Sequence, residues 1–202
     1  MDSRKKLFAI AIAAALTAPA FAQNATTQQD EAKDSAQDAR QQQRIEQGLK
    51  SGALTDEEAA RLEKDEARVQ KMEGRAERNG KISSAEQKRI DEAQQKVSKD
   101  IYAQKHDAQK DANPNSETNK RLESDVARDA KQDQRIEQGV KSGELTTKEA
   151  GRLERGEASD DRSEAKAAGN GDISDKEQRR IARNETRESK RIHKEKTNGK
   201  KQ

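Results

Sequence analysis

The chain has 202 residues, of which 28% are hydrophobic and 40% are charged, and it contains two Phe, one Tyr and neither Trp nor Cys. This composition excludes the core of a large enzyme, and the lack of Cys excludes disulfides and thiolate metal sites. The formal net charge of +3 falls to +1 without residues 1–22. The overall charge therefore gives no reason to expect a nucleic-acid partner.

The N-terminus has the pattern of a secretory signal peptide. A basic start at residues 2–6 precedes an apolar run over residues 7–16, and residues 20–22 read Ala-Phe-Ala, the small-x-small pattern of a cleavage site. The apolar run is shorter than the roughly 20 residues that a membrane span needs. We therefore predict cleavage after Ala22 and a mature chain that is periplasmic or secreted, with no membrane span.

An internal duplication dominates the rest of the chain. The sequence Gln-Arg-Ile-Glu-Gln-Gly-Leu-Lys-Ser-Gly at residues 43–52 recurs with one change at residues 134–143. Extended without gaps, residues 34–107 and 125–198 share 37 identities in 74 positions. This pattern predicts two tandem domains with the same fold.

The segments outside the two copies have a different character. Residues 23–33 are polar and are predicted to be a flexible leader, and residues 199–202 form a basic tail. Residues 108–124 contain Asn-Pro-Asn-Ser, which favours turns, and are predicted to be a linker.

Each copy contains two signals for a helix end followed by a helix start. A Gly after Ser or Asn can take the left-handed conformation that ends a helix, and Ser or Thr followed three residues later by Glu is a capping box that begins the next. The four sets are Gly52 with Thr55 and Glu58, Gly80 with Ser83 and Glu86, Gly143 with Thr146 and Glu149, and Gly171 with Ser174 and Glu177.

Apolar residues between these signals recur at spacings of three, four and seven, and no stretch alternates with period two. We therefore predict an all-α protein with two tandem antiparallel three-helix repeats, each a helical hairpin or bundle. The predicted helices are residues 34–50, 55–78 and 83–106, with counterparts at 125–141, 146–169 and 174–197.

The second copy has fewer large apolar residues than the first. Val69, Met72, Val97 and Tyr102 are replaced there by Asp160, Ser163, Glu188 and His193. Gly151 and Gly156 also lie inside its long middle helix, where Gly is unfavourable. We therefore expect the second copy to be the less stable one.

The motif Gln-Arg-Ile-Glu-Gln-Gly-x-Lys-Ser-Gly-x-Leu-Thr, followed by Glu-Ala-x-Arg-Leu-Glu and Asn-Gly-x-Ile-Ser, occurs in both copies. It resembles a group of small exported proteobacterial proteins of unknown function with tandem helix-turn-helix repeats. The resemblance spans both copies and implies no catalytic residues.

Separately, the later turn of each copy resembles a degenerate EF-hand loop. Such loops have Gly at position 6, an aliphatic residue at position 8 and Glu at position 12. The first position, an Asp in functional loops, is Arg75 or Lys166 here, and a cation there repels a metal ion. Two interpretations remain open: turns that only cap helices, or weak binding of calcium or manganese. The candidate metal ligands are Glu77, Asn79, Ser83, Glu86, Asn170, Asp172, Ser174 and Glu177.

Other candidate sites are few. No nucleophile motif or phosphate loop is present, and most carboxylates have Lys or Arg three or four residues away, which is typical of solvated helix faces. We therefore do not expect an enzyme. The last predicted helix is strongly basic and could contact an anionic envelope surface or an acidic protein. Its candidate residues are Arg179, Arg180, Arg183, Arg187, Lys190, Arg191 and Lys194.

These observations lead to the prediction of an exported, non-catalytic helical binding or scavenging protein, with divalent-cation binding at the turns as its most specific activity. Two alternatives stay open. One is a hydrophilin-like protective stress protein that is largely disordered in dilute solution. The other is an adaptor that binds anionic envelope surfaces through the basic C-terminal helix.

Overall fold

The structure, a computed structural model, describes residues 20–200, with side chains from residue 27 onward. This part of the chain is all-helical and contains no β-strand, which confirms the predicted class. Of the predicted signal peptide, only residues 20–22 fall within the described residues. The helices are α1 (Ala20–Lys50), α2 (Asp56–Ala76), α3 (Ser84–His106), α4 (Glu117–Lys141), α5 (Thr147–Ala168) and α6 (Asp175–Thr197), with a short 3-10 turn, Glu77–Asn79, after α2.

The predicted helix ends are confirmed in detail. Gly52, Gly80, Gly143 and Gly171 all have positive φ, between 67° and 83°. The four predicted capping boxes are present at the starts of α2, α3, α5 and α6. These local signals place each turn within one or two residues of its predicted position.

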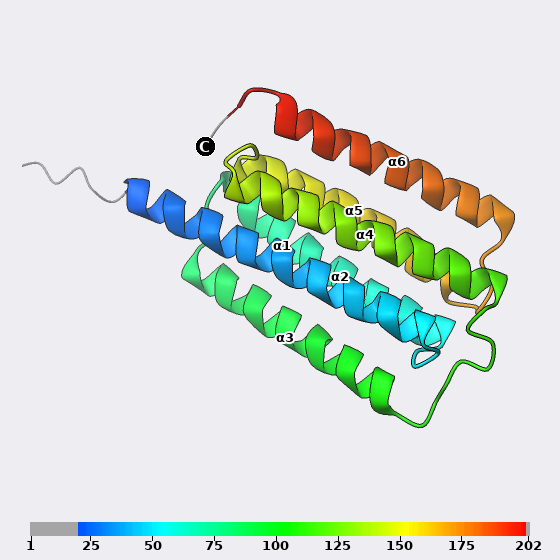
Figure 1. Cartoon of the computed structure of the whole chain (residues 1–202). Coiled ribbons are helices and arrows are strands. Elements are labelled where there is room, and N and C mark those ends of the chain that lie inside the picture. Colours follow the sequence, from blue (N-terminus) through cyan, green and yellow to red (C-terminus); the bar gives the residue numbers. More distant parts are fainter. Residues whose placement is uncertain (1–19, 201–202) are drawn as a thin grey trace, which may run out of the picture.

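Four long helices form the centre of the molecule. α1 packs antiparallel against α4, and α2 packs antiparallel against α5, and these are the most extensive helix contacts in the structure. α3 lies along the outer side of the α1–α2 pair and α6 along the outer side of the α4–α5 pair (Figure 1). The two sequence copies thus share one bundle, a relation that the sequence left open.

α1 and α4 begin earlier than predicted. Residues 23–33, which the composition predicts as a leader, belong to α1, because Thr27 and Ala32 are buried in the bundle. The first residues of α4 lie within the predicted linker. The Ser116 hydroxyl accepts a hydrogen bond from the Asn119 backbone N–H and caps this helix.

Apolar side chains gather at the two ends of the bundle. One cluster joins the C-terminal ends of α1 and α5 to the N-terminal ends of α2 and α4, and includes Ile45, Leu49, Leu54, Leu62, Leu122 and Ile173. The other joins the C-terminal ends of α4 and α6 to the N-terminal end of α5, and includes Ile136, Val140, Leu145, Leu153 and Ile192. The interior between these two clusters has a different chemistry.

The described helices do not have the hydropathy of a membrane span. Within residues 20–200, no helix combines the length and the apolar character that crossing a membrane requires.

Candidate metal centre in the bundle interior

The interior between the apolar ends is lined by carboxylates. Apart from Glu58 and Glu149, which cap helices, seventeen Asp and Glu residues are buried, whereas no Lys, Arg or His among residues 27–200 is. We call these seventeen residues the acidic interior. They are Glu31, Asp34, Asp38, Glu63, Glu66, Glu73, Glu77, Asp125, Asp129, Asp133, Glu154, Glu157, Asp160, Asp161, Glu164, Glu185 and Glu188.

These residues occupy the helix positions that normally hold core apolar residues. Along α2 and into the 3-10 turn after it, the series Glu63, Glu66, Gln70, Glu73 and Glu77 advances by three, four, three and four residues, and every member is buried. Such spacing keeps side chains on one face of a helix. The fold therefore turns a stripe of acids inward from each of its four central helices.

The sequence-based interpretation of these carboxylates as solvated faces was wrong for this stripe. The neighbouring cations Lys64 and Arg68 are exposed, whereas Glu66, two residues from each of them, is buried on another face of the helix. A missed signal was available, because acids at alternating spacings of three and four, in helices with few large apolar residues, can only share a face.

The structure also corrects the interpretation of Asp160 and Glu188. They replace Val69 and Val97 of the first copy, and the substitutions suggested a weakened core. The structure buries both and places them in the acidic interior. Gly156 also has a clear role, because a Cβ there would lie 2.4 Å from the carboxylate carbon of Glu188.

Three groups of carboxylates converge closely enough to share a metal ion. In each group one oxygen from every member lies within 4.8 Å of the others. The groups are Asp38 with Glu73 and Glu154, Glu63 with Asp129 and Asp161, and Asp129 with Glu164 and Glu185. Calcium binds oxygens at about 2.3–2.6 Å, so two oxygens on opposite sides of one ion lie about 5 Å apart. The spacing of these groups suits such an ion.

Few hydrogen-bond donors reach these oxygens. Gln94 Nε2 donates to Asp38 Oδ1 at 3.0 Å and to Glu73 Oε1 at 2.9 Å. Gln42 Nε2 donates to Glu63 Oε2 at 3.0 Å, and Ser35 Oγ donates to Glu154 Oε1 at 3.1 Å.

Many buried oxygens have no donor at all. Both carboxylate oxygens lack a hydrogen-bond partner in Glu66, Asp129, Asp133, Glu157, Asp161 and Glu164. A buried charge without a partner is strongly unfavourable. These groups need a proton or a cation to remain buried.

Burial raises the pKa of these carboxyl groups. Removal from water raises the pKa of Asp38 to about 6 and that of Glu63 to about 8. For Asp129 and Asp161, burial and the charges of neighbouring carboxylates together hold the pKa well above its usual range. A cation at their centre would favour the charged form and reverse these shifts.

The residues predicted to bind metal at the turns are placed differently. Glu86 Oε2 accepts hydrogen bonds from the Ser83 backbone N–H at 2.9 Å and the Ser83 hydroxyl at 2.6 Å. Ser174 and Glu177 make the same contacts at 3.1 and 2.6 Å. Hydrogen bonds from the serines lower the pKa of both Glu86 and Glu177. Both carboxylates thus serve as caps.

The other predicted ligands at the turns do not converge on a common site. Asn79 Oδ1 accepts from the Lys81 N–H, and Asn170 Oδ1 accepts from the Asp172 N–H. Glu77 is buried, and its side chain lies against Gly151 of α5. Within the described residues, no close carboxylate group includes Glu86, Asp172 or Glu177. Cation binding at the turns stays a prediction.

The basic residues predicted to contact an anionic surface lie along α6. Six of the seven are exposed, and the seventh, Arg191, is half-buried and pairs with Glu188 at 2.6 Å between Nη1 and Oε2. The inner face of the same helix carries Ile181, Glu185 and Ile192, all buried. α6 therefore separates an acidic inside from a basic outside.

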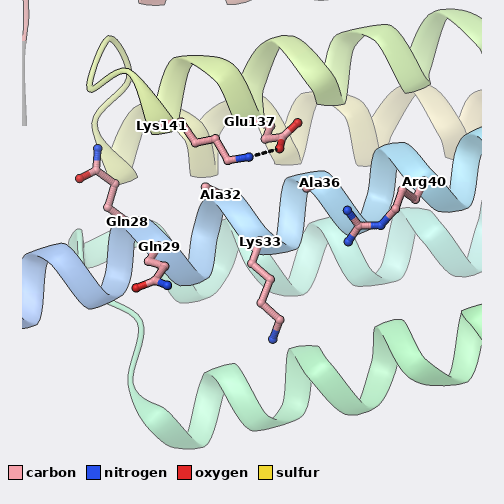
Figure 2. Close-up of a pocket in the computed structure, with 8 residues that line it drawn as sticks. All are labelled: Gln28, Gln29, Ala32, Lys33, Ala36, Arg40, Glu137 and Lys141. Atoms are coloured by element: carbon pink, nitrogen blue, oxygen red, sulfur yellow. Dashed lines mark hydrogen bonds and ion pairs between the residues drawn. The ribbon is translucent and has the colours of Figure 1, made fainter.

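A shallow surface groove of about 500 Å³ lies between α1 and α4 (Figure 2). Ala32 and Ala36 lie between its longer side chains, which include Lys33, Arg40 and Lys141, and Lys141 pairs with Glu137 at 2.5 Å. This groove carries cationic and amide groups and is distinct from the acidic interior.

Comparison with known proteins gave no relative that could assign the site. No family model, no curated protein and no solved structure matches the chain.

Proposed function

We propose that this protein binds several divalent cations inside its helical bundle and acts as a non-catalytic scavenging or buffering module. One observation carries this proposal: seventeen carboxylates are buried together with no buried Lys, Arg or His among the described residues. A structural salt-bridge network would contain both signs of charge. An interior of one sign requires a counter-charge that comes from outside the chain.

The chemistry of the ligands selects the class of cation. The acidic interior offers carboxylate and amide oxygens, the donors that calcium, magnesium and manganese prefer. The chain has no Cys, and both His residues, His106 and His193, are exposed. Calcium and manganese fit better than magnesium, because magnesium keeps several waters and a packed interior leaves little space for them.

The remaining predicted features are compatible with this role. Export through the predicted signal peptide would place the protein where cations are not buffered by the cytosol. The EF-hand-like turns would add weak sites at the surface. The outward basic face of α6 would be free to contact an anionic envelope surface while the interior holds its cations.

Calorimetry and native mass spectrometry on residues 23–202 test the proposal. We expect several calcium or manganese ions per chain, and we expect Asp38→Asn to bind fewer. The matched control is Glu86→Gln with Glu177→Gln, which removes the turn carboxylates and should leave the interior ions in place.

A folded protein that binds no cation at millimolar concentration would overturn the proposal. Loss of all ions in the turn variant would move the site from the interior to the turns. Circular dichroism in chelator and in calcium tests the hydrophilin-like alternative. That alternative predicts a mostly disordered chain under both conditions.

A further inference from the structure

The two halves of the acidic interior are related by the duplication but are not equal. Adding 91 to Asp38 and Glu73, and subtracting 91 from Glu154, converts the first carboxylate group into Asp129, Glu164 and Glu63. These three residues are divided between the other two groups, which both contain Asp129. The second half therefore contains counterparts of all three carboxylates of the first group, together with additional carboxylates.

The additional ligands replace amides of the first copy. Asp161 stands where the first copy has Gln70, and Glu185 stands where it has Gln94. Together the second half offers five convergent carboxylates, Glu63, Asp129, Asp161, Glu164 and Glu185, whereas the first half offers three.

In the first half, Gln94 occupies the position that Glu185 has in the second half. Its amide nitrogen donates to both Asp38 and Glu73, at 3.0 and 2.9 Å, and so joins two members of that group. Glu185 occupies the equivalent position beside Asp129 and Glu164. It brings a negative charge where Gln94 brings a donor. Gln132 Nε2 donates to Oε2 of Glu185 at 2.6 Å, and the other oxygen, Oε1, has no donor. An amide therefore satisfies only one oxygen of this carboxylate, and the other is left for a cation.

Asp161 gives an independent indication that a ligand belongs there. Its side chain is completely buried, it converges on Glu63 and Asp129, and neither of its oxygens has a hydrogen-bond donor. Both oxygens of Asp129 and of Glu164 also lack a donor. Proteins rarely leave such groups without a partner.

We propose that the first half holds one divalent cation, on Asp38, Glu73 and Glu154, and that the second half holds a pair of cations bridged by the carboxylate of Asp129. One ion of the pair contacts Glu63 and Asp161, and the other contacts Glu164 and Glu185. Three carboxylates with one divalent ion, or five with two, leave the same residual charge of about −1 on the convergent carboxylates of each half. This inference rests on the proposed function.

Native mass spectrometry with manganese alone as the probe tests the difference between the halves. Asp38→Asn should lose one ion relative to the unsubstituted chain, and Asp129→Asn should lose two. Two exchanged residues test the difference more directly. Glu185→Gln, which introduces the amide of the first half, should lose one ion, and Gln94→Glu should gain one.

Electron paramagnetic resonance supplies a second readout. Two manganese ions joined by one carboxylate are exchange-coupled, and their spectrum differs from that of isolated ions. We expect this coupled signal in the unsubstituted chain and in Asp38→Asn, and its loss in Glu185→Gln and Asp129→Asn.

The outcomes separate the two proposals. If the unsubstituted chain is folded and binds no manganese, both fail. If it binds manganese but Asp38→Asn and Asp129→Asn lose the same number of ions and no coupled signal appears, only the bridged pair is overturned. Circular dichroism of each variant in chelator verifies folding, and Asp and Asn are close in size, so the exchange preserves the packing.

Discussion

Gly74 of α2 and Gly151 of α5 lie against each other where these two helices pack closely. A Cβ on Gly74 would lie 2.5 Å from the backbone oxygen of Gly151, and a Cβ on Gly151 would lie 2.6 Å from Oε2 of Glu77. Glycine inside a helix costs about 1 kcal/mol relative to alanine. Here the close approach of two backbones accounts for both glycines, of which Gly151 was expected only to weaken its helix.

We expect Gly74→Ala to destabilise the fold by about 1 to 3 kcal/mol, because the backbone of α5 cannot move aside as a flexible side chain could. Helix propensity alone predicts the opposite sign. Chemical denaturation in the presence of calcium measures the effect. Thr186→Ala on the exposed face of α6 is the control and should be neutral or slightly stabilising, since this hydroxyl bonds only to its own helix. A stabilised Gly74→Ala variant would contradict the packing described for α2 and α5.

At the scale of the element, Arg135 of α4 supplies two of the hydrogen bonds that hold α6 in place. Arg135 donates from Nη1 to the Ser189 hydroxyl at 2.7 Å and from Nη2 to the Ser189 carbonyl at 3.0 Å. Arg44 makes the same two contacts with Ser98, at the same distances, to hold α3. The equivalent residues Arg44 and Arg135 therefore make the same contacts in both copies.

Arg135→Ala should loosen α6 selectively. The change removes two hydrogen bonds and leaves the Ser189 hydroxyl unpaired, so amide hydrogen exchange in α6 should accelerate several-fold while α1 and α2 change little. Arg183→Ala, an exposed position on the same helix, serves as the control. Equal acceleration throughout the chain would show that α6 does not open on its own.

The helices themselves were largely predictable, and their pairing was not. Gly52, Thr55 and Glu58 carry short-range information, because a left-handed residue and a capping box act within a few residues. The association of α1 with α4 depends on faces that carry Asp34, Asp38 and Asp129 in place of apolar residues. Hydrophobic patterning identifies a core by its apolar face, so it overlooked an interior made of acids.

At the scale of the whole molecule, the acidic interior makes stability depend on pH in an unusual direction. Burial raises the pKa of Asp34 to about 7 and that of Glu31 to about 8, whereas carboxyls in an unfolded chain titrate near about 4. Between these values the folded state holds protons that the unfolded state has released. Stability is therefore fully present below about pH 4 and declines as pH rises toward 8.

We therefore expect the melting temperature of the cation-free protein to fall from pH 4 to pH 8. Millimolar calcium or manganese should restore it at pH 7 to 8 and have little effect at pH 4, where protons already neutralise the interior. Thermal melts across this range, with chelator and with cation, measure both effects. A cation-free melting temperature that rises with pH, as it does for proteins whose carboxylates are paired with bases, would contradict the burial described here.

The composition of the first carboxylate group has a consequence for the origin of the protein. Asp38 and Glu73 belong to the first copy and Glu154 to the second, so neither copy alone contains all three members of this group. A single-copy ancestor with this geometry could have assembled such a group only as a homodimer, with two identical halves. With both copies in one chain, each half can change alone. The difference between Gln94 and its counterpart Glu185 is one that a homodimer of identical chains could not have.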